Sequence, residues 1–437
     1  MNILLTTMGS HGDVLPFVAL ARELRRRGHA PLLLINPAFR RLANDAGIPC
    51  TPLGEPTEVR DLARDTPGIM HHREGSRLVL RRFVVPFTRP VHDRIVDLHR
   101  DRPFHAIVSH PICFGAPLAA ERISVPTVNA ALSPMMWLSP SDTLGPPPGL
   151  HLLPDIVAQP LMRLLLKPML RAVADDDLNR ERRSLGFPAQ RDALLTANRS
   201  GDLCLGLWSP VLRPLLADDP PNAVVCGFPW NDRDAEREHA VQDFEAFLSR
   251  GEPPILFTLG TAAVHTPGPF YHEAARACAL LGRRGMLLIG NSGLRLETLP
   301  PGVRTFTYAP FSGLLPRVAA CVHHGGIGTT AQCLRAGTPA LITPLAHDQF
   351  DNARRCHALG VSRTLHHRRV TAPRLARALR ALLGDPLVAQ RAQAIAPHVA
   401  AEHGASGAAE AIESLVRGTH TEYFMNKTTL SALTAQR

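Results

Sequence analysis

Short, almost continuously apolar segments alternate with segments whose apolar residues recur at helical spacing, and this alternation occurs twice along the chain. The apolar segments of the first series cover residues 2–7, 30–36, 104–110 and 125–132, and those of the second cover 254–259, 285–290, 303–308, 319–324 and 339–344. Strands that are apolar throughout are buried on both faces, as in parallel sheets covered by helices on both sides. The pattern predicts an α/β chain with two doubly wound, Rossmann-like domains.

The length of the chain supports this division, because 437 residues exceed one ordinary core and favour two domains of about 200 residues each. We predict an N-terminal domain over residues 1–218, a polar and Pro-rich linker over 219–252, a C-terminal domain over 253–417 and a disordered tail over 418–437. Ligands of open parallel sheets bind at the C-terminal ends of the strands. We therefore expect the two domains to face a shared cleft.

One segment of the second series, VHHGGIGTTAQ over residues 322–332, is rich in glycine, histidine and threonine. It follows an apolar strand and precedes a helix predicted from about Thr329 to Arg335. A tight turn alone would explain one or two glycines but not all three together with both threonines. Glycines let the backbone approach a phosphate, the amides of a helix N-terminus point at it, and hydroxyl groups add donors. No Lys precedes the threonines, so this is not a P-loop, and we predict a diphosphate-binding turn.

A metal site is a poor explanation of the same segment. Adjacent histidines rarely bind one ion, and no third ligand lies at a familiar spacing. We therefore expect neither a metal ion nor a cofactor. Further along, Asp348 and Gln349 stand side by side, and a carboxylate next to a carboxamide can bind vicinal sugar hydroxyls. Together with the diphosphate-binding turn, this pair predicts a nucleotide-sugar site.

The formal net charge of +10 is compatible with nucleic acid, an anionic membrane surface or phosphorylated ligands. The basic residues are scattered and aromatic residues make up 5% of the chain, which argues against a nucleic-acid surface built on stacking. The eight cysteines form no CxxC pair, so we expect neither a zinc ribbon nor a disulfide framework. No signal peptide and no membrane-spanning segment is visible. We predict a cytoplasmic protein.

The segment 156–174 combines leucines and methionines with Arg163, Lys167 and Arg171 at four-residue intervals. One interpretation is a helix pair that packs on the domain, breaks at Pro168 and carries a solvated basic edge. The other is a surface that binds lipid or a lipophilic substrate, with peripheral contact at the inner face of the membrane. The sequence leaves both interpretations open.

The motifs described above resemble a known family. Its signature runs here from Tyr308-Ala309-Pro310 through the glycine-rich turn and Gly337-Thr338-Pro339 to His347-Asp348-Gln349 and Asn352. This is similar to the nucleotide-sugar signature of the UDP-glycosyltransferase superfamily of inverting GT-B enzymes. The resemblance covers most of residues 1–415, and it is closest to the bacterial branch that holds a rhamnosyltransferase of glycolipid biosynthesis and the antibiotic and sterol glycosyltransferases.

The resemblance implies roles for individual residues. Tyr308 would stack on the nucleobase, and Asp348 and Gln349 would hold the sugar hydroxyls. Gln332 stands where many members carry a ribose-binding Glu, which leaves the choice between uridine and thymidine open. The diphosphate would be held by residues of the turn and of one neighbouring strand end, namely Thr261, His324, Gly325, Gly326, Gly328 and Thr329.

The N-terminal loop Gly9–Pro16, GSHGDVLP, matches the acceptor-side loop of the same superfamily. Inverting transfer needs a base for the acceptor hydroxyl, and the loop offers His11 and Asp13. We favour Asp13, because the antibiotic and sterol members carry Asp at this position, although Asp13 can also cap a helix starting at Val14. His110 ends a strand where plant members carry the Asp that orients their base, so an Asp13–His110 pair is a further hypothesis.

These features predict an inverting O-glycosyltransferase that moves a hexose from a UDP- or dTDP-sugar to a hydroxyl of a lipophilic acceptor, such as a glycolipid precursor, a sterol or a natural product. One alternative is an enzyme of the same fold similar to UDP-N-acetylglucosamine 2-epimerase. The other is a non-catalytic partner that binds a nucleotide sugar and stabilises another transferase. The joint presence of Asp13, His324, Asp348 and Gln349 argues against an inactive protein. The sequence does not predict an oligomeric state.

Overall fold

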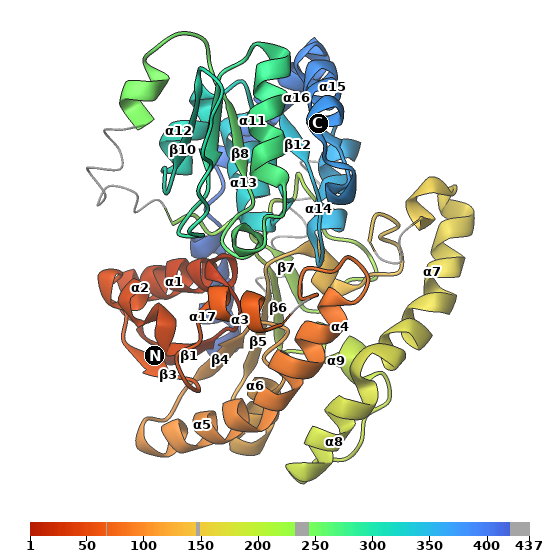
Figure 1. The fold of residues 1–437 in the computed structure, drawn as a ribbon. Helices are drawn as coiled ribbons and strands as arrows, with labels where there is room; N and C mark the ends of the chain where they lie inside the picture. Colours follow the sequence, from red (N-terminus) through yellow and green to blue (C-terminus); the bar gives the residue numbers. More distant parts are fainter. Residues whose placement is uncertain (67, 146–148, 232–243, 420–437) are drawn as a thin grey trace.

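The computed structural model describes residues 1–66, 68–145, 149–231 and 244–419, and it shows two α/β domains stacked one on the other (Figure 1). The N-terminal domain contains a seven-stranded parallel sheet of order β3-β2-β1-β4-β5-β6-β7. Its strands are β1 Asn2–Thr6, β2 Ala30–Ile35, β3 Cys50–Pro52, β4 Ala106–Ser109, β5 Thr127–Ala131, β6 Leu203–Gly206 and β7 Ala223–Val225.

The C-terminal domain contains a six-stranded parallel sheet of order β10-β9-β8-β11-β12-β13. Its strands are β8 Ile255–Thr258, β9 Gly285–Leu288, β10 Val303–Phe306, β11 Ala320–His323, β12 Ala340–Ile342 and β13 Ser362–Thr364. The two parallel sheets confirm the predicted fold class.

Helices cover both faces of each sheet (Figure 1). In the N-terminal half of the chain they are α1 His11–Arg26, α2 Arg40–Asp45, α3 Val59–Asp65, α4 Gly75–Val79, α5 Thr88–Asp101, α6 Gly115–Ile123, α7 Asp155–Leu170, α8 Asp176–Ser184 and α9 Ala193–Arg199. In the C-terminal half they are α11 Phe270–Leu281, α12 Phe311–Leu314, α13 Ile327–Ala336, α14 Gln349–Ala358, α15 Ala372–Leu383, α16 Pro386–Ala400 and α17 Gly404–Val416.

Strand β1 shows why these strands are apolar at every position. Ile3 and Leu5 belong to the core cluster that contains α1 residues, whereas Leu4 belongs to the cluster that contains residues of α5 and α6. All three side chains are fully buried, because alternate residues of a strand point to opposite faces of the sheet. An alternating apolar and polar strand would have exposed a charge to one of these two helical layers.

Each sheet has one position where the chain reverses its direction of growth. In the N-terminal sheet this switch point lies between β1 and β4, and in the C-terminal sheet it lies between β8 and β11. Such a point leaves the ends of two adjacent strands accessible, because their connections run to opposite sides. The segments that follow these four strands contain Asp13, His110, Thr261 and His324.

The predicted domain boundaries need two corrections. Strand β7 lies within 219–252, which we expected to be linker, yet it pairs with β6 in the N-terminal sheet. Helix α17, expected in the C-terminal domain, buries Ala408 and Ile412 in the N-terminal core cluster and lies beside α1 (Figure 1). Residues 420–437 of the predicted tail lie outside the described residues.

The segment around Pro168 also differs from expectation. Helix α7 runs through Pro160 and Pro168 without a break and continues through a π-helical turn over Arg171–Asp175 into α8. Both prolines are on exposed or edge positions of α7, where water can satisfy the carbonyl groups that a proline leaves unpaired. Among the described helices, none has the length and the apolar content needed to cross a bilayer.

Candidate active site

On the acceptor side, Asp13 lies in the first turn of α1 directly after β1. Ser10 is the N-cap residue, and its backbone N–H donates to Asp13 Oδ2 at 2.7 Å while its hydroxyl group donates to the same oxygen at 3.1 Å. Gly12 N in turn donates to Ser10 Oγ at 3.2 Å. This is a capping box with Asp at its third helical position. The helix therefore starts at His11 rather than at Val14, and Asp13 does contribute to capping.

The loop before α1 is shaped around the carboxylate of Asp13. Gly9 has φ +125°, and a Cβ atom at this position would lie 2.3 Å from Asp13 Oδ2. Burial raises the pKa of Asp13, since desolvation disfavours the charged carboxylate. Within the described residues, Oδ1 of Asp13 accepts no hydrogen bond from the protein. Asp13 is thus held by one oxygen, has a raised proton affinity, and can use the other oxygen as a base.

The predicted pairing of Asp13 with His110 is wrong in this structure. No hydrogen bond or ion pair joins the two side chains within the described part of the chain, because Asp13 Oδ2 turns back onto Ser10. His110 Nδ1 instead accepts from Ile112 N at 3.3 Å, and burial lowers the pKa of His110 to about 3. His11 is exposed and contacts Phe39 edge-on, with ring centroids 5.0 Å apart.

On the donor side, the glycine-rich turn connects β11 to α13, as the sequence predicts. Gly325 has φ +94°, and a Cβ atom there would approach Gln349 O to 2.9 Å, so only glycine fits. Gly326 is the N-cap residue of α13, which begins at Ile327 rather than near Thr329. The fully buried His323 accepts from Gly325 N at 3.1 Å through Nδ1 and so stabilises the turn from inside the domain.

His324 lies between two glycines from different strand ends. A Cβ atom on Gly260, after β8, or on Gly326 would lie 2.4 Å from the His324 ring. Burial, with smaller contributions from two nearby histidines, lowers the pKa of His324 to about 4, so the imidazole is neutral at neutral pH. Its Nδ1 atom is buried without a hydrogen-bond partner in the described chain. A neutral, confined imidazole beside a helix N-terminus is suited to hydrogen-bond a diphosphate oxygen.

The other residues predicted for the nucleotide lie around the same edge of the sheet. Thr261 is exposed after β8, and Tyr308 is half-buried after β10. On α13, Gly328 is exposed with open space around its Cα, Thr329 is buried, and Gln332 is half-buried one turn further along. Outside its own helix and chain neighbours, no atom of the described residues lies within 4 Å of a Cβ atom built on Gly328, so the glycine is not needed for packing and leaves room for a ligand close to the backbone.

The predicted sugar-binding pair divides into two different roles. Asp348 directly precedes α14, and its Oδ2 accepts from Asn352 Nδ2 at 2.9 Å. The same amide group donates to Gly325 O at 2.9 Å, so Asn352 ties Asp348 to the glycine-rich turn. Gln349, by contrast, is buried, and its Oε1 accepts from Leu345 N at 2.8 Å and from Ala346 N at 3.1 Å. Its carbonyl oxygen holds the preceding loop and is not available to a sugar hydroxyl.

The two domains bring Asp13 and Asp348 close together. Burial, with smaller contributions from the charges of Asp13 and Asp351, raises the pKa of Asp348 to about 7. The adjacent His347 has φ +57° and contacts Ser76 of α4, with 3.1 Å between Nδ1 and Oγ. A non-glycine residue with positive φ is held only where its surroundings fix it. The loop before α14 is thus positioned by the N-terminal domain.

Three residues of this site were not assigned a role from the sequence: Gly260, His347 and Asn352. Asn352 stands in the quoted signature, and its position four residues after Asp348 places both on one helix face. The contacts of Gly260 and His347 depend on segments far away in the chain and leave no local signal. Within the described ranges, no group of three or more His, Cys, Asp or Glu side chains is arranged to bind a metal ion.

Comparison with known proteins identifies the family of the chain. Two family models match the chain. The model of the erythromycin biosynthesis protein CIII-like C-terminal domain matches residues 287–415, and the model of the glycosyltransferase family 28 N-terminal domain matches residues 3–82. The O-mycaminosyltylonolide 6-deoxyallosyltransferase of Streptomyces fradiae is 32% identical over 435 residues, which cover 94% of this chain and 97% of that protein.

Two further proteins are similar to this chain, one in sequence and one in fold. A sterol 3-beta-glucosyltransferase of Arabidopsis thaliana is 28% identical over 378 residues, covering 83% of this chain and 57% of the relative. The crystal structure of a glycosyltransferase from Streptomyces sp. SF2575, complexed with thymidine diphosphate, shares the fold with a TM-score of 0.62. It is 19% identical, and the match covers 95% of this chain and 99% of that one. The chain is a glycosyltransferase with the GT-B fold and belongs to the branch of the UDP-glycosyltransferase superfamily that contains the antibiotic and sterol glycosyltransferases.

Proposed function

We propose that the protein transfers a hexose, with inversion, from a UDP- or dTDP-sugar to a hydroxyl group of a lipophilic acceptor such as a natural product or a sterol. One observation carries this proposal. The carboxylate of Asp13, held after β1 by Ser10, lies close enough to Asp348, next to the glycine-rich turn, for its charge to raise the pKa of Asp348. The acceptor class is supported by relatives that are named for O-mycaminosyltylonolide and for a sterol.

The chemistry assigns each domain one half of the reaction. Asp13 removes the proton of the acceptor hydroxyl as its oxygen attacks the anomeric carbon and forms the new glycosidic bond. The bond between that carbon and the diphosphate breaks, and the electron pair leaves with the nucleoside diphosphate. His324, the backbone amides at the start of α13 and the hydroxyl groups of Thr261 and Thr329 stabilise the leaving group. Asp348 holds the sugar, and Tyr308 stacks on the nucleobase.

An epimerase would act on the nucleotide sugar alone and would need no acceptor hydroxyl. The decisive test offers the purified protein a panel of UDP- and dTDP-sugars in a thermal-shift assay. Sugars that bind are then incubated with candidate macrolide and sterol acceptors, and the products are analysed by mass spectrometry. We expect a product heavier by one anhydrohexose unit and an equal amount of free nucleoside diphosphate. Isomerised nucleotide sugar without acceptor would support the epimerase, and binding without any turnover would support the non-catalytic partner.

Nucleotide binding should not depend on a divalent metal. The groups assigned to the diphosphate are backbone amides, hydroxyls and a neutral imidazole, none of which needs a bridging cation to accept an anion. In calorimetry with UDP and dTDP, we expect equal affinity with excess Mg²⁺ and with excess EDTA. A loss of more than about tenfold in EDTA, equivalent to about 1.4 kcal/mol, would show that a metal ion is part of the site.

Helix α7 supports the membrane contact that the sequence left open. It buries Ala158, Met162, Leu166 and Leu170, but its outward side is apolar as well, with Ile156 85% and Leu164 69% exposed. Six of the nine exposed large hydrophobic residues of the described chain lie between residues 152 and 165. Arg163 and Lys167 are exposed on the same helix, Lys167 and Arg171 pair with Asp192, and α7 lies at the periphery of the molecule (Figure 1). An apolar face with a basic edge fits an anionic lipid surface, where a lipophilic acceptor would reside.

Vesicle co-sedimentation tests this contact. We expect binding to vesicles that contain phosphatidylserine, decreasing with added salt because exposed charges are screened within about 8 Å at physiological ionic strength. Replacing Ile156 and Leu164 together by Gln should abolish it, whereas Leu280→Gln on α11, also an exposed leucine, should not. No binding at low salt would refute the contact, and a dimer that dissociates in the double variant would assign the surface to a second copy.

A further inference from the structure

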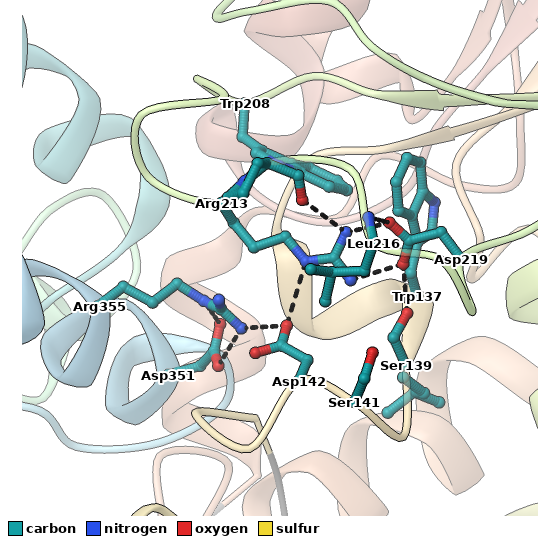
Figure 2. A network of polar contacts seen from close by, with 12 residues as sticks. Trp137, Ser139, Ser141, Asp142, Trp208, Arg213, Leu216, Asp219, Asp351 and Arg355 are labelled. Carbon is teal, nitrogen blue, oxygen red and sulfur yellow. Dashed lines mark hydrogen bonds and ion pairs between the residues drawn. The ribbon is translucent and has the colours of Figure 1, made fainter. Parts of the chain in front are cut away.

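A buried network of charged side chains crosses between the domains beneath the candidate site. Its central residue is Asp142, in the loop that follows β5 and the 3₁₀ turn Pro134–Trp137. Asp142 Oδ2 accepts from Arg355 Nη2 of α14 at 2.7 Å and from Arg213 Nε, between β6 and β7, at 3.2 Å. Figure 2 shows the two guanidinium groups reaching the same carboxylate oxygen from different parts of the fold.

Each arginine also has a carboxylate partner within its own domain. Arg355 donates to Asp351 through Nε at 2.9 Å and through Nη2 at 3.0 Å, one turn earlier on α14. Arg213 makes a two-pronged contact with Asp219, which Ser139 also contacts. All of these charged side chains are buried, with 8% exposure or less. Asp142 is thus the bridge between two ion pairs that would persist without it.

Helix α14 connects this bridge to the chemistry. Its first turn carries Asn352, which bonds both Asp348 and Gly325, and its second turn carries Arg355. A second contact joins the same two segments, because Arg354 Nε donates to Leu144 O at 2.5 Å. The loop 138–145 is thereby fixed to the donor helix at two positions. Since a helix is stiff over two turns, fixing Arg355 also fixes the orientation of its N-terminal end.

We infer that Asp142 is a positioning residue that sets the donor helix α14, and through it Asp348, relative to Asp13 on the acceptor domain. This inference rests on the transfer reaction proposed above, because positioning matters only if the two domains share one reaction. Buried charges that are fully hydrogen-bonded favour one relative geometry over others, since sliding the domains would separate Asp142 from Arg355 and take one charge-assisted hydrogen bond from each of these two buried side chains. Small errors in the placement of reacting groups are costly for catalysis, with about 1 Å corresponding to a hundredfold loss.

The test compares Asp142→Asn with Asp219→Asn. Both remove one buried carboxylate charge that bonds Arg213, but only the first breaks the contact between the domains. We expect both variants to melt at lower temperature than the wild type. Only Asp142→Asn should lower kcat, by about ten- to a hundredfold. Its Kd for dTDP and UDP should stay within about twofold, because the groups assigned to the diphosphate all lie in the C-terminal domain.

A second measurement does not require activity. In hydrogen–deuterium exchange of the full chain, peptides covering the first turn of α14 should exchange faster in Asp142→Asn than in Asp219→Asn. Arg355→Lys serves as the milder variant if Asp142→Asn does not fold, because lysine keeps the charge but lacks the planar guanidinium group. It should also lower kcat and leave the Kd for the nucleotide nearly unchanged. Equal kcat and equal exchange in the two Asp variants would overturn the inference. A wild type that transfers no sugar would instead refute the proposed function, while the exchange comparison would still report on the bridge.

Discussion

Replacing Asp13 by Asn is expected to lower turnover by about a hundred- to ten-thousandfold, or roughly 3–5 kcal/mol of activation free energy, while folding and donor binding survive. The amide retains the size of the side chain and an oxygen that can accept from Ser10 N, so the capping box persists. It cannot accept the acceptor proton. The measurement is kcat at saturating donor with one acceptor, together with Kd for dTDP by calorimetry.

The matched control is Ser10→Ala, which removes the hydroxyl side of the capping box. Loss of an N-cap side chain costs about 1 kcal/mol of stability, so this variant should melt earlier and keep most of its turnover. His11→Ala should cost much less than Asp13→Asn. If instead Asp13→Asn stays within a few-fold of wild type and His11→Ala is inactive, the base is His11.

The pH dependence gives an independent signature of the same base. Turnover requires the ionised form of Asp13, so it should fall on the acid side of the pKa of this group. Because burial raises that pKa, the acid limb should lie above the ordinary aspartate value of about 3.9. His110, whose pKa is about 3 through burial, stays neutral throughout and should not shape the profile. The limb should be absent from the residual activity of Asp13→Asn.

Replacing Asp348 by Ala is expected to weaken use of the nucleotide sugar by about ten- to a hundredfold, since hydrogen bonds to charged groups contribute about 1.5–3 kcal/mol. Affinity for free dTDP or UDP should change little, because Asp348 is assigned to hexose hydroxyls only. The comparison is kcat/KM for the donor against Kd for the nucleoside diphosphate. Equal losses in both quantities would place Asp348 at the diphosphate.

Asp348→Ala should also alter the pH dependence of stability. The pKa of Asp348 is raised to about 7 in the folded protein, so the folded state binds its proton more tightly than the unfolded chain. The free energy of unfolding therefore falls as pH rises from about 4 to about 7 through this group. Without ligand, the melting temperature of the variant should exceed that of wild type most clearly above pH 7.

Sequence reasoning located the candidate site because its residues follow strands directly. The segments after β1, β8, β11 and β12 carry Asp13, Thr261, His324 and Asp348. The turn with His324 was predicted from an apolar run followed by turn residues, whereas the roles of Asp13 and Thr261 were implied by the resemblance to a family. Both signals are local: strand burial shows in consecutive residues, and a glycine with positive φ shows in the turn itself. Each parallel sheet then brings the ends of its own strands to one edge, whatever lies between them in the chain. The sequence alone therefore determined the fold class and the strand ends at which the candidate site residues lie.

The tertiary structure decided what each side chain contacts. Asp13 is hydrogen-bonded to Ser10 rather than to His110, and the side-chain oxygen of Gln349 accepts a hydrogen bond from the loop that precedes it. The tertiary structure also placed Asp142 against Arg355, 213 residues away. Burial, desolvation and hydrogen-bond choice depend on the whole set of neighbours around an atom, and most of those neighbours are distant in sequence. A sequence pattern can therefore predict that a residue lies at the edge of a sheet. Only the packed domains determine its partner, its pKa and its position relative to the opposite domain.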